Sequence, residues 1–227
     1  MPPRPKARLD DIVESATRIF GEKGYRRTLI SDVASDLGIA PGTIYTYVES
    51  KDALFHLVVE RASGVTTEPA SFPIAAPDPA DTLKHSVEAF SRTSKLTELS
   101  AALKREKADD IVEELGAIVR ELYASIANSR LLIGLVERSA VDVPELRTNY
   151  YVKGRRAFLK KIESYLVSRI EIGQLRAVPD TAATTRFVVE AISWFANHRH
   201  GDQDSDNITE EGAEQVCVDM LVHALLP

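Results

Sequence analysis

Apolar residues recur at intervals of three and four along most of this 227-residue chain, and this spacing constrains the fold more than any other feature. Residues at such intervals share one face of an α-helix, whereas a half-buried strand needs alternation with a period of two. The first segment with the helical pattern contains Leu9, Ile12, Val13, Ala16, Ile19 and Phe20. No segment alternates with a period of two for long. The sequence therefore predicts an all-α protein.

Four helices are expected within the first sixty residues. Gly24 is expected to end the first helix, and Thr28 to cap the second with its hydroxyl. Gly38 lies in the short turn "LGIA", after which Pro41 suits the first turn of a third helix. The third helix ends near Tyr47, and "ESK" leads into the fourth.

The chain is expected to divide into three parts. Residues 1–60 form a small helical domain with a basic N-terminal arm, and residues 61–81 form a linker rich in proline and small residues. Phe72 and Ile74 are the apolar residues that could pin this linker to the body of the protein. Residues 82–227 form a larger helical domain, in which amphipathic segments return.

The formal net charge of −6 is unevenly distributed. Through Lys51 there are eight basic and seven acidic residues, so the acidity lies almost entirely in the rest of the chain. This asymmetry permits nucleic-acid binding near the N-terminus. Cys217 is the single cysteine, and there is neither a signal-peptide pattern nor an apolar stretch of membrane-spanning length. We therefore expect a cytoplasmic protein.

Two short helices joined by a tight glycine-containing turn are typical of a helix-turn-helix motif, whose second helix enters the major groove of DNA. Ile44 and Val48 are expected to face the core. The side chains left to meet DNA are Thr43, Tyr45, Thr46 and Tyr47. Threonines can contact base edges or phosphates, and tyrosines can donate to phosphate oxygens. Lys51 lies near the N-terminus of the fourth helix, where a phosphate is favoured, and the arm residues Arg4, Lys6 and Arg8 add positive charge.

The segments "FGEKGY", "DVASDLGIAPGTIYTYV" and "SKDALF" resemble the DNA-binding domain of TetR-family transcriptional regulators over roughly residues 9 to 60. The resemblance implies an all-α homodimer with an N-terminal helix-turn-helix domain and a larger C-terminal domain for dimerisation and ligand binding. It implies base-facing positions at Pro41, Gly42, Thr43, Tyr45 and Thr46, and phosphate-facing positions at Thr28, Tyr45, Tyr47 and Lys51. The chain departs from the family at Ala40, where many members have a capping serine or threonine.

Aromatic residues of the C-terminal part are the candidates for a ligand pocket. They are Tyr123, Tyr150, Phe158, Trp194 and Phe195. Aromatic stripes at helical spacing also occur in cores and dimer interfaces, so both alternatives stay open here. The last two helices, expected over residues 181–198 and 210–226, carry continuous apolar stripes, and we expect homodimerisation through them.

No catalytic motif is present in the sequence, and we expect neither an enzyme nor a cofactor. The histidines of "HRH" at residues 198–200 are two apart and do not converge on one helix face, so we expect no metal site. The sequence thus favours a repressor that a small-molecule effector releases from a palindromic DNA operator. The alternative is a helical homodimeric binding or scaffold protein with a degenerate helix-turn-helix, which the near-zero charge of the N-terminal region supports.

Overall fold

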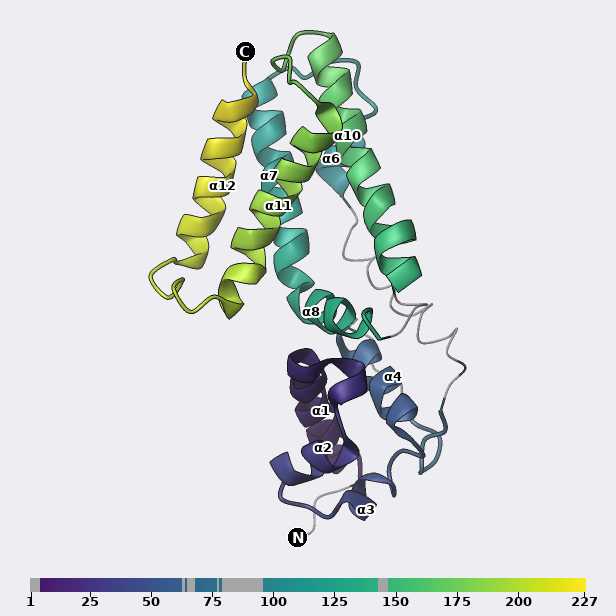
Figure 1. The fold of residues 1–227 in the computed structure, drawn as a ribbon. Coiled ribbons are helices and arrows are strands. Elements are labelled where there is room, and N and C mark those ends of the chain that lie inside the picture. Colours follow the sequence, from purple (N-terminus) through teal and green to yellow (C-terminus); the bar gives the residue numbers. More distant parts are fainter. Residues whose placement is uncertain (1–4, 63, 65–67, 77, 79–95, 143–146) are drawn as a thin grey trace. The chain divides into compact units, whose positions relative to one another are not determined.

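The computed structural model describes residues 1–227 except 1–4, 63, 65–67, 77, 79–95 and 143–146. Within the described residues every regular element is a helix, so the expectation of an all-α fold is confirmed (Figure 1). The chain forms two compact units. The first contains the chain up to Arg92 together with Leu131–Gly154, and the second contains Thr93–Arg130 and the chain from Arg155 onward. The division at residues 60 and 81 stays a prediction from the sequence.

The first unit is built around two long helices, α1 and α4. Its elements are α1 (Pro5–Arg27), α2 (Ile30–Asp36), α3 (Pro41–Ile44), α4 (Lys51–Ala62), most of α8 (Arg130–Ser139) and most of the π-helix η1 (Thr148–Arg155). The apolar face expected for the first helix is buried against α4, and the ring of Phe20 meets that of Phe55 edge-on with 5.1 Å between centroids. Because α1 begins at Pro5, Lys6 and Arg8 belong to its first turn rather than to an arm before it.

Gly24 interrupts α1 near its C-terminal end, as the sequence suggested. Its backbone has φ 77° and ψ 169°, a conformation that side chains with a Cβ rarely adopt. A Cβ at this position would also lie 3.0 Å from the carbonyl oxygen of Arg138 in α8. The Arg138 guanidinium donates a hydrogen bond of 3.1 Å to the Glu22 carbonyl oxygen. The missing side chain at Gly24 therefore permits the close approach of α8 to α1.

The second unit is a helical bundle. It consists of α6 (Thr97–Ala102), α7 (Ile111–Asn128), α10 (Arg156–Glu171), α11 (Thr181–Ala196), the 3-10 helix η2 (His198–Gly201) and α12 (Glu210–Leu225). Figure 1 shows α7, α11 and α12 running side by side, with α10 next to α11. The expected stripe of Leu115, Ile118 and Leu122 in α7 is buried. The helix expected around Leu83, Val87 and Phe90 lies outside the described residues.

A buried ion pair holds three helices of this bundle together. Arg169 of α10 is 1% exposed, and its Nε donates to Glu114 Oε1 of α7 at 2.9 Å. Its Nη2 donates to the Ala102 carbonyl oxygen of α6 at 2.8 Å, and the Tyr165 hydroxyl donates to Glu114 Oε1 at 3.2 Å. Burial raises the pKa of Tyr165 and keeps its hydroxyl a donor. A buried charge is tolerated only with partners of this kind, so the geometry of α6, α7 and α10 is coupled.

Replacement of Gly24 tests the close approach of α8. Gly24→Ala should lower the free energy of unfolding by about 1–3 kcal/mol, because it combines a strained φ with a clash against the Arg138 carbonyl oxygen. Gly21 is a matched control, since it lies in a regular turn of α1 and an added Cβ there meets nothing within 4 Å. Gly21→Ala should be stabilising by up to about 1 kcal/mol. Scanning calorimetry of the two variants measures this, and equal effects would contradict the argument.

Candidate nucleic-acid interface

The turn between α2 and α3 is formed by backbone hydrogen bonds. Gly38 has φ 63°, and its N–H donates to the Ser35 carbonyl oxygen at 3.2 Å. The Ile39 N–H donates to the Ala34 carbonyl oxygen at 2.9 Å. These bonds satisfy carbonyl groups at the end of α2 and turn the chain sharply, which is the usual role of glycine after a helix. The two helices are therefore joined as the helix-turn-helix interpretation requires.

The Asp36 carboxylate, at the end of α2, ties this helix to α1. The Arg18 guanidinium forms two hydrogen bonds with it, of 2.9 and 2.6 Å, and the Ser15 hydroxyl donates to it at 2.6 Å. These hydrogen bonds lower the pKa of Asp36 to about 2, and the bond from Arg18 contributes more than the bond from Ser15. The carboxylate is therefore ionised, and accepts all three bonds, throughout the neutral range.

The expected capping role of Thr28 is wrong. The N-cap of α2 is Leu29, whose N–H donates to the Asp32 carboxylate at 2.9 Å. Thr28 is 1% exposed, and its hydroxyl donates to the Gly24 carbonyl oxygen at 2.8 Å. The hydroxyl is used to close the interrupted end of α1 and is not available to cap α2. A phosphate contact by Thr28 stays a prediction, which this burial does not favour.

Helix α3 has only four residues, and burial rather than length holds it in place. Ile44 and Val48 are both 0% exposed in the core of the first unit. The cap position Ala40 is extended, with φ −71° and ψ 142°, and contributes no side-chain hydrogen bond. Its carbonyl oxygen accepts from the Thr43 N–H at 2.9 Å. Pro41 then supplies a first helical residue that lacks an N–H, so the missing cap leaves fewer donors unsatisfied.

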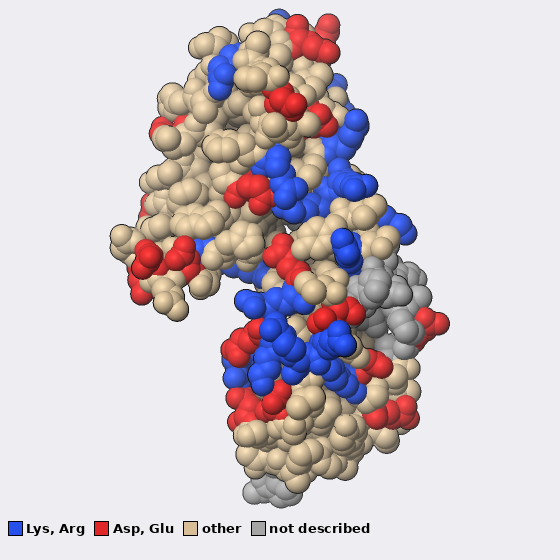
Figure 2. Space-filling model, viewed as in Figure 1, with Lys and Arg blue, Asp and Glu red and all other residues tan. Residues whose placement is uncertain are grey.

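The remaining residues of this segment face outward. Pro41, Gly42, Tyr45 and Thr46 are exposed, with Tyr45 at 48%, whereas Thr43 and Tyr47 are partly buried. The Thr46 hydroxyl donates to the Thr43 carbonyl oxygen at 2.7 Å, so toward a base it offers an acceptor and a methyl group. Figure 2 shows mostly uncharged surface around α3 in this view of the first unit. The structure thus groups the predicted base-facing residues on one uncharged stretch of surface, residues 41–46, which we call the neutral projection.

Lys51 lies at the start of α4, as predicted. Its Nζ is 3.3 Å from the Arg26 carbonyl oxygen and 4.4 Å from the ring centroid of Tyr25. The Tyr25 hydroxyl in turn donates to Asp52. Burial lowers the pKa of Lys51 from its ordinary value. The Tyr25 ring and the Arg26 carbonyl oxygen hold the ammonium group of Lys51 in a defined place near the N-terminal end of α4.

Sequence reasoning missed two residues of this site, Tyr25 and Ser50. Ser50 caps α4, because its hydroxyl accepts from the Ala53 N–H at 3.1 Å. A serine before "KDALF", with Asp52 in the first turn, is a capping signal that the sequence carries. No local signal reveals that Tyr25 packs under Lys51, because the two residues meet only through the packing of α1 on α4.

Three of the five predicted ligand residues come together in the second unit. The Tyr123 hydroxyl donates to Glu210 at 2.9 Å and lies 3.4 Å from the Phe195 carbonyl oxygen. The rings of Trp194 and Phe195 pack edge-to-face with 4.9 Å between centroids. Phe158 is half-buried on α10, and Tyr150 belongs to the first unit, where it meets Tyr151. Tyr123 is buried, so its ring is a core residue in this conformation.

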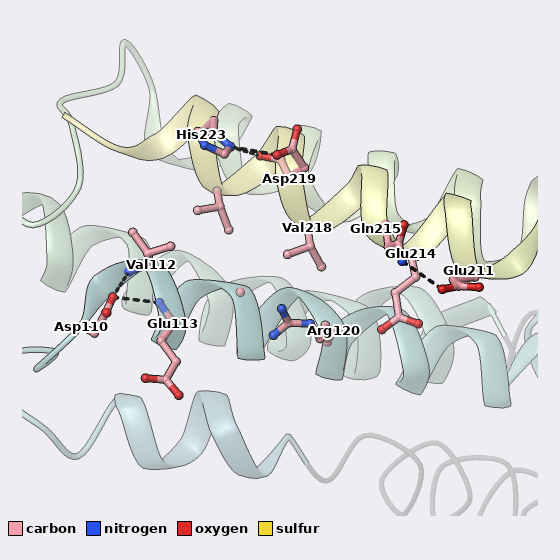
Figure 3. Close-up of a pocket in the computed structure, with 12 residues that line it drawn as sticks. Asp110, Val112, Glu113, Arg120, Glu211, Glu214, Gln215, Val218, Asp219 and His223 are labelled. Carbon is pink, nitrogen blue, oxygen red and sulfur yellow. Dashed lines mark hydrogen bonds and ion pairs between the residues drawn. The ribbon is translucent and has the colours of Figure 1, made fainter.

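A groove of about 750 Å³ lies between α7 and α12, and Figure 3 shows the side chains that line it. Val112, Gly116 and Val218 form part of its lining, and Arg120 lies along it. Its carboxylates are those of Asp110, Glu113, Glu211, Glu214 and Asp219. This excess of negative charge disfavours an anionic occupant. None of the five predicted aromatic residues lines the groove.

Across the described residues, no helix combines the length and apolar character needed to span a bilayer. The same residues contain no cluster of three or more histidine, cysteine or acidic side chains that could hold a metal ion.

Comparison with known proteins agrees with a helix-turn-helix protein. Residues 12–58 match the family described as bacterial regulatory proteins, tetR family. YvdT of Bacillus subtilis, an uncharacterised helix-turn-helix transcriptional regulator, is 35% identical over 61 residues, which cover 27% of this chain and 31% of that protein. The transcriptional repressor KstR2 of Mycolicibacterium smegmatis is 29% identical over 58 residues, covering 26% of this chain and 28% of KstR2. The matched segment is thus less than a third of either relative.

The likeness of folds extends further along the chain. The structure of the ketosteroid transcriptional regulator KstR2 of Mycobacterium tuberculosis is similar with a TM-score of 0.56, over 99% of this chain and 97% of that one. At 16% identity, this likeness shows a shared fold. The match to the tetR family covers residues 12–58, and beyond them the likeness is one of fold alone.

The Asp36 carboxylate makes the stability of the helix-turn-helix dependent on pH. Its pKa is lowered on folding, so its contribution is complete above about pH 4, the unfolded value, and is lost as the pH falls toward about 2. Asp36→Asn should lower the melting temperature at pH 7, and the difference from the wild type should shrink below pH 4. Asp11→Asn, on the exposed face of α1, is the control and should change little. A pH-independent difference between wild type and Asp36→Asn would contradict the assignment.

Proposed function

We propose that this protein is a dimeric, ligand-responsive regulator of transcription that binds operator DNA and acts as a repressor. The observation that carries the proposal is the neutral projection formed by Pro41–Thr46, which is held by the buried Ile44. A short rigid helix without charged side chains is suited to the floor of a major groove, where it meets base edges rather than phosphates. The repressor KstR2 among its relatives supports the direction of regulation.

Base readout is assigned to Gly42, Thr43, Tyr45 and Thr46. Gly42 has open space around it, so the backbone can approach DNA closely. Tyr47 and Lys51 are assigned to phosphates, since a phenol and an ammonium group donate to phosphate oxygens without reading sequence. In this assignment most contacts come from hydroxyl groups and from the close approach of the backbone, and few come from cations. A segment of almost zero net charge could therefore still bind a polyanion. The acidic residues are concentrated in the rest of the chain.

Dimerisation is assigned to an apolar face of α11 and α12. The exposed residues on this face include Phe187 at 67% and Trp194 at 36% on α11, and Val216 at 46% and Met220 at 63% on α12. Ala183 and Ala224 lie on the same helices and are exposed, and small residues let helices approach closely. Two copies of this face would pack about a two-fold axis as a four-helix bundle. The dimer would then present two recognition helices to two half-sites, about 34–36 Å apart.

Regulation requires two conformations of the dimer with different separations of the recognition helices. An effector shifts the balance between them only by its difference in affinity for the two states. Tyr123, Tyr150, Phe158, Trp194 and Phe195 stay the proposed effector contacts. Trp194 is exposed and Phe195 is partly buried, so both rings are more accessible than the buried ring of Tyr123, whose hydroxyl would have to give up its bond to Glu210.

The role of Lys51 is tested by the salt dependence of DNA binding. Lys51→Ala should weaken binding to all duplexes and reduce the slope of log K against log salt by about two, because one phosphate contact is lost at each of the two recognition helices of the dimer. Lys104→Ala, an exposed lysine of the second unit, is the control and should leave the slope unchanged. Fluorescence anisotropy with a duplex selected by the protein from a random pool measures both. Binding that is absent or independent of salt in the wild type would favour the scaffold alternative.

The dimer face is tested by the introduction of a charge at its most exposed aromatic residue. Phe187→Glu should convert the dimer to a monomer at micromolar concentration, because two carboxylates would be buried near the two-fold axis. Val141→Glu is the control, since Val141 is 84% exposed in the first unit and lies on neither helix. Analytical ultracentrifugation distinguishes the two species. A wild-type protein that sediments only as a monomer would disprove the assignment.

A further inference from the structure

The linker that follows α4 returns to the recognition segment. The Ile74 N–H donates to the Tyr47 carbonyl oxygen at 2.8 Å, and the Glu49 N–H donates to the Ile74 carbonyl oxygen at 2.9 Å. Ile74 thus forms a parallel bridge with Val48. We call residues 72–74 the strap. The strap and the recognition segment belong to the same compact unit.

Side chains reinforce the backbone pairing. The ring of Phe72 meets the ring of Tyr47 at an interplanar angle of 74°, with 5.4 Å between centroids. Ile74 is half-buried and packs against the core cluster that contains Ile44 and Val48. An edge-to-face aromatic pair is attractive beyond the apolar area that it buries. The Tyr47 side chain is therefore held from one side by Phe72, while its backbone is held by Ile74.

The segment between α3 and α4 needs such support. Helix α3 ends at Ile44, and α4 begins at Lys51. Between them, the Tyr47 carbonyl oxygen and the Glu49 N–H form their hydrogen bonds with Ile74 of the strap. A residue outside regular helix samples many conformations unless other contacts restrict it. The orientation of Tyr47 is thus determined by residues more than twenty positions further along the chain.

We propose that Phe72 and Ile74 are positioning residues for DNA recognition: they hold Tyr47 in the orientation in which its hydroxyl meets a phosphate. This inference rests on the proposed function, and it adds residues from outside the helix-turn-helix motif to the recognition apparatus. The strap contributes no charge, so it acts on the geometry of binding and not on the number of phosphates neutralised. Because a phosphate contact does not read sequence, loss of the strap should weaken binding to every duplex by a similar factor while the salt dependence stays the same.

The test uses Phe72→Ala in the full-length protein, with Ser71→Ala as the control at an exposed neighbouring position. The probes are a duplex selected from a random pool by the wild-type protein and a scrambled duplex of the same length and composition. Phe72→Ala should weaken binding to both duplexes about two- to ten-fold, which is the range expected for loss of one aromatic pair. The slope against salt should not change, because no charge is removed. Unchanged binding to both duplexes, or weakening on the selected duplex alone, would overturn the proposal.

A double-mutant cycle with Tyr47→Phe shows whether Phe72 acts through the Tyr47 hydroxyl. In the Tyr47→Phe background, where that hydroxyl is absent, Phe72→Ala should have little further effect on binding to the selected duplex. Additive losses would mean that Phe72 acts independently of Tyr47, and would overturn the proposal. A residue that served stability alone would lower the melting temperature without this coupling.

Hydrogen exchange provides a readout that does not require DNA. The amides of Glu49 and Ile74 should exchange slowly in the wild type and in Ser71→Ala, and faster in Phe72→Ala, because these amides are protected only by the strap pairing. Unprotected amides in the wild type would overturn the inference whatever the protein binds. Protected amides in a wild-type protein that fails to bind any duplex would instead refute the proposed function, and with it the role in recognition.

Discussion

A helix of four residues cannot hold itself in place, and the proposed recognition element of this protein is such a helix. Forming one turn fixes several backbone dihedrals for a single hydrogen bond, so α3 depends on burial for its position. Ile44 and Val48 provide that burial, within a core that α1 and α4 form around Phe20 and Phe55. Three features before α3 determine where it begins. They are the interruption of α1 at Gly24, the turn at Gly38 and the ion pair of Asp36 with Arg18.

The two units are stabilised in different ways. The first relies on an apolar core, with the Arg18–Asp36 ion pair partly exposed and mostly uncharged surface around α3. The second includes buried polar clamps, of which Arg169 with Glu114 is the most enclosed. Arg130 and Arg199 also pair with Glu210, the first residue of α12, whose side chain is 49% exposed. Such clamps specify the angles between helices, because a buried charge without its partners is costly. Apolar residues of α11 and α12, among them Phe187 and Met220, stay exposed outside this framework.

Local patterns predicted much of the N-terminal unit. The burial of Ile44 and Val48, the exposure of Tyr45 and Thr46, and the place of Lys51 at the start of α4 all followed from helical spacing. Thr28 failed as a cap because the competing acceptor, the Gly24 carbonyl oxygen, becomes available only where α1 is interrupted. The partners of Tyr25 and Tyr47 could not be predicted either, since they come from α4 and from the strap. Contacts between distant segments leave no local periodicity in a sequence.

The sequence by itself determined the helical class, the core face of α1 and the residues available to meet DNA, because these depend on the order of apolar and polar residues along one helix. The tertiary structure alone decided how those residues are held. It placed Tyr25 under Lys51, returned Ile74 to Val48, and enclosed Arg169 between three helices. The physical reason is that each of these arrangements balances desolvation against partners from other segments, and those partners are brought together only when the chain has folded.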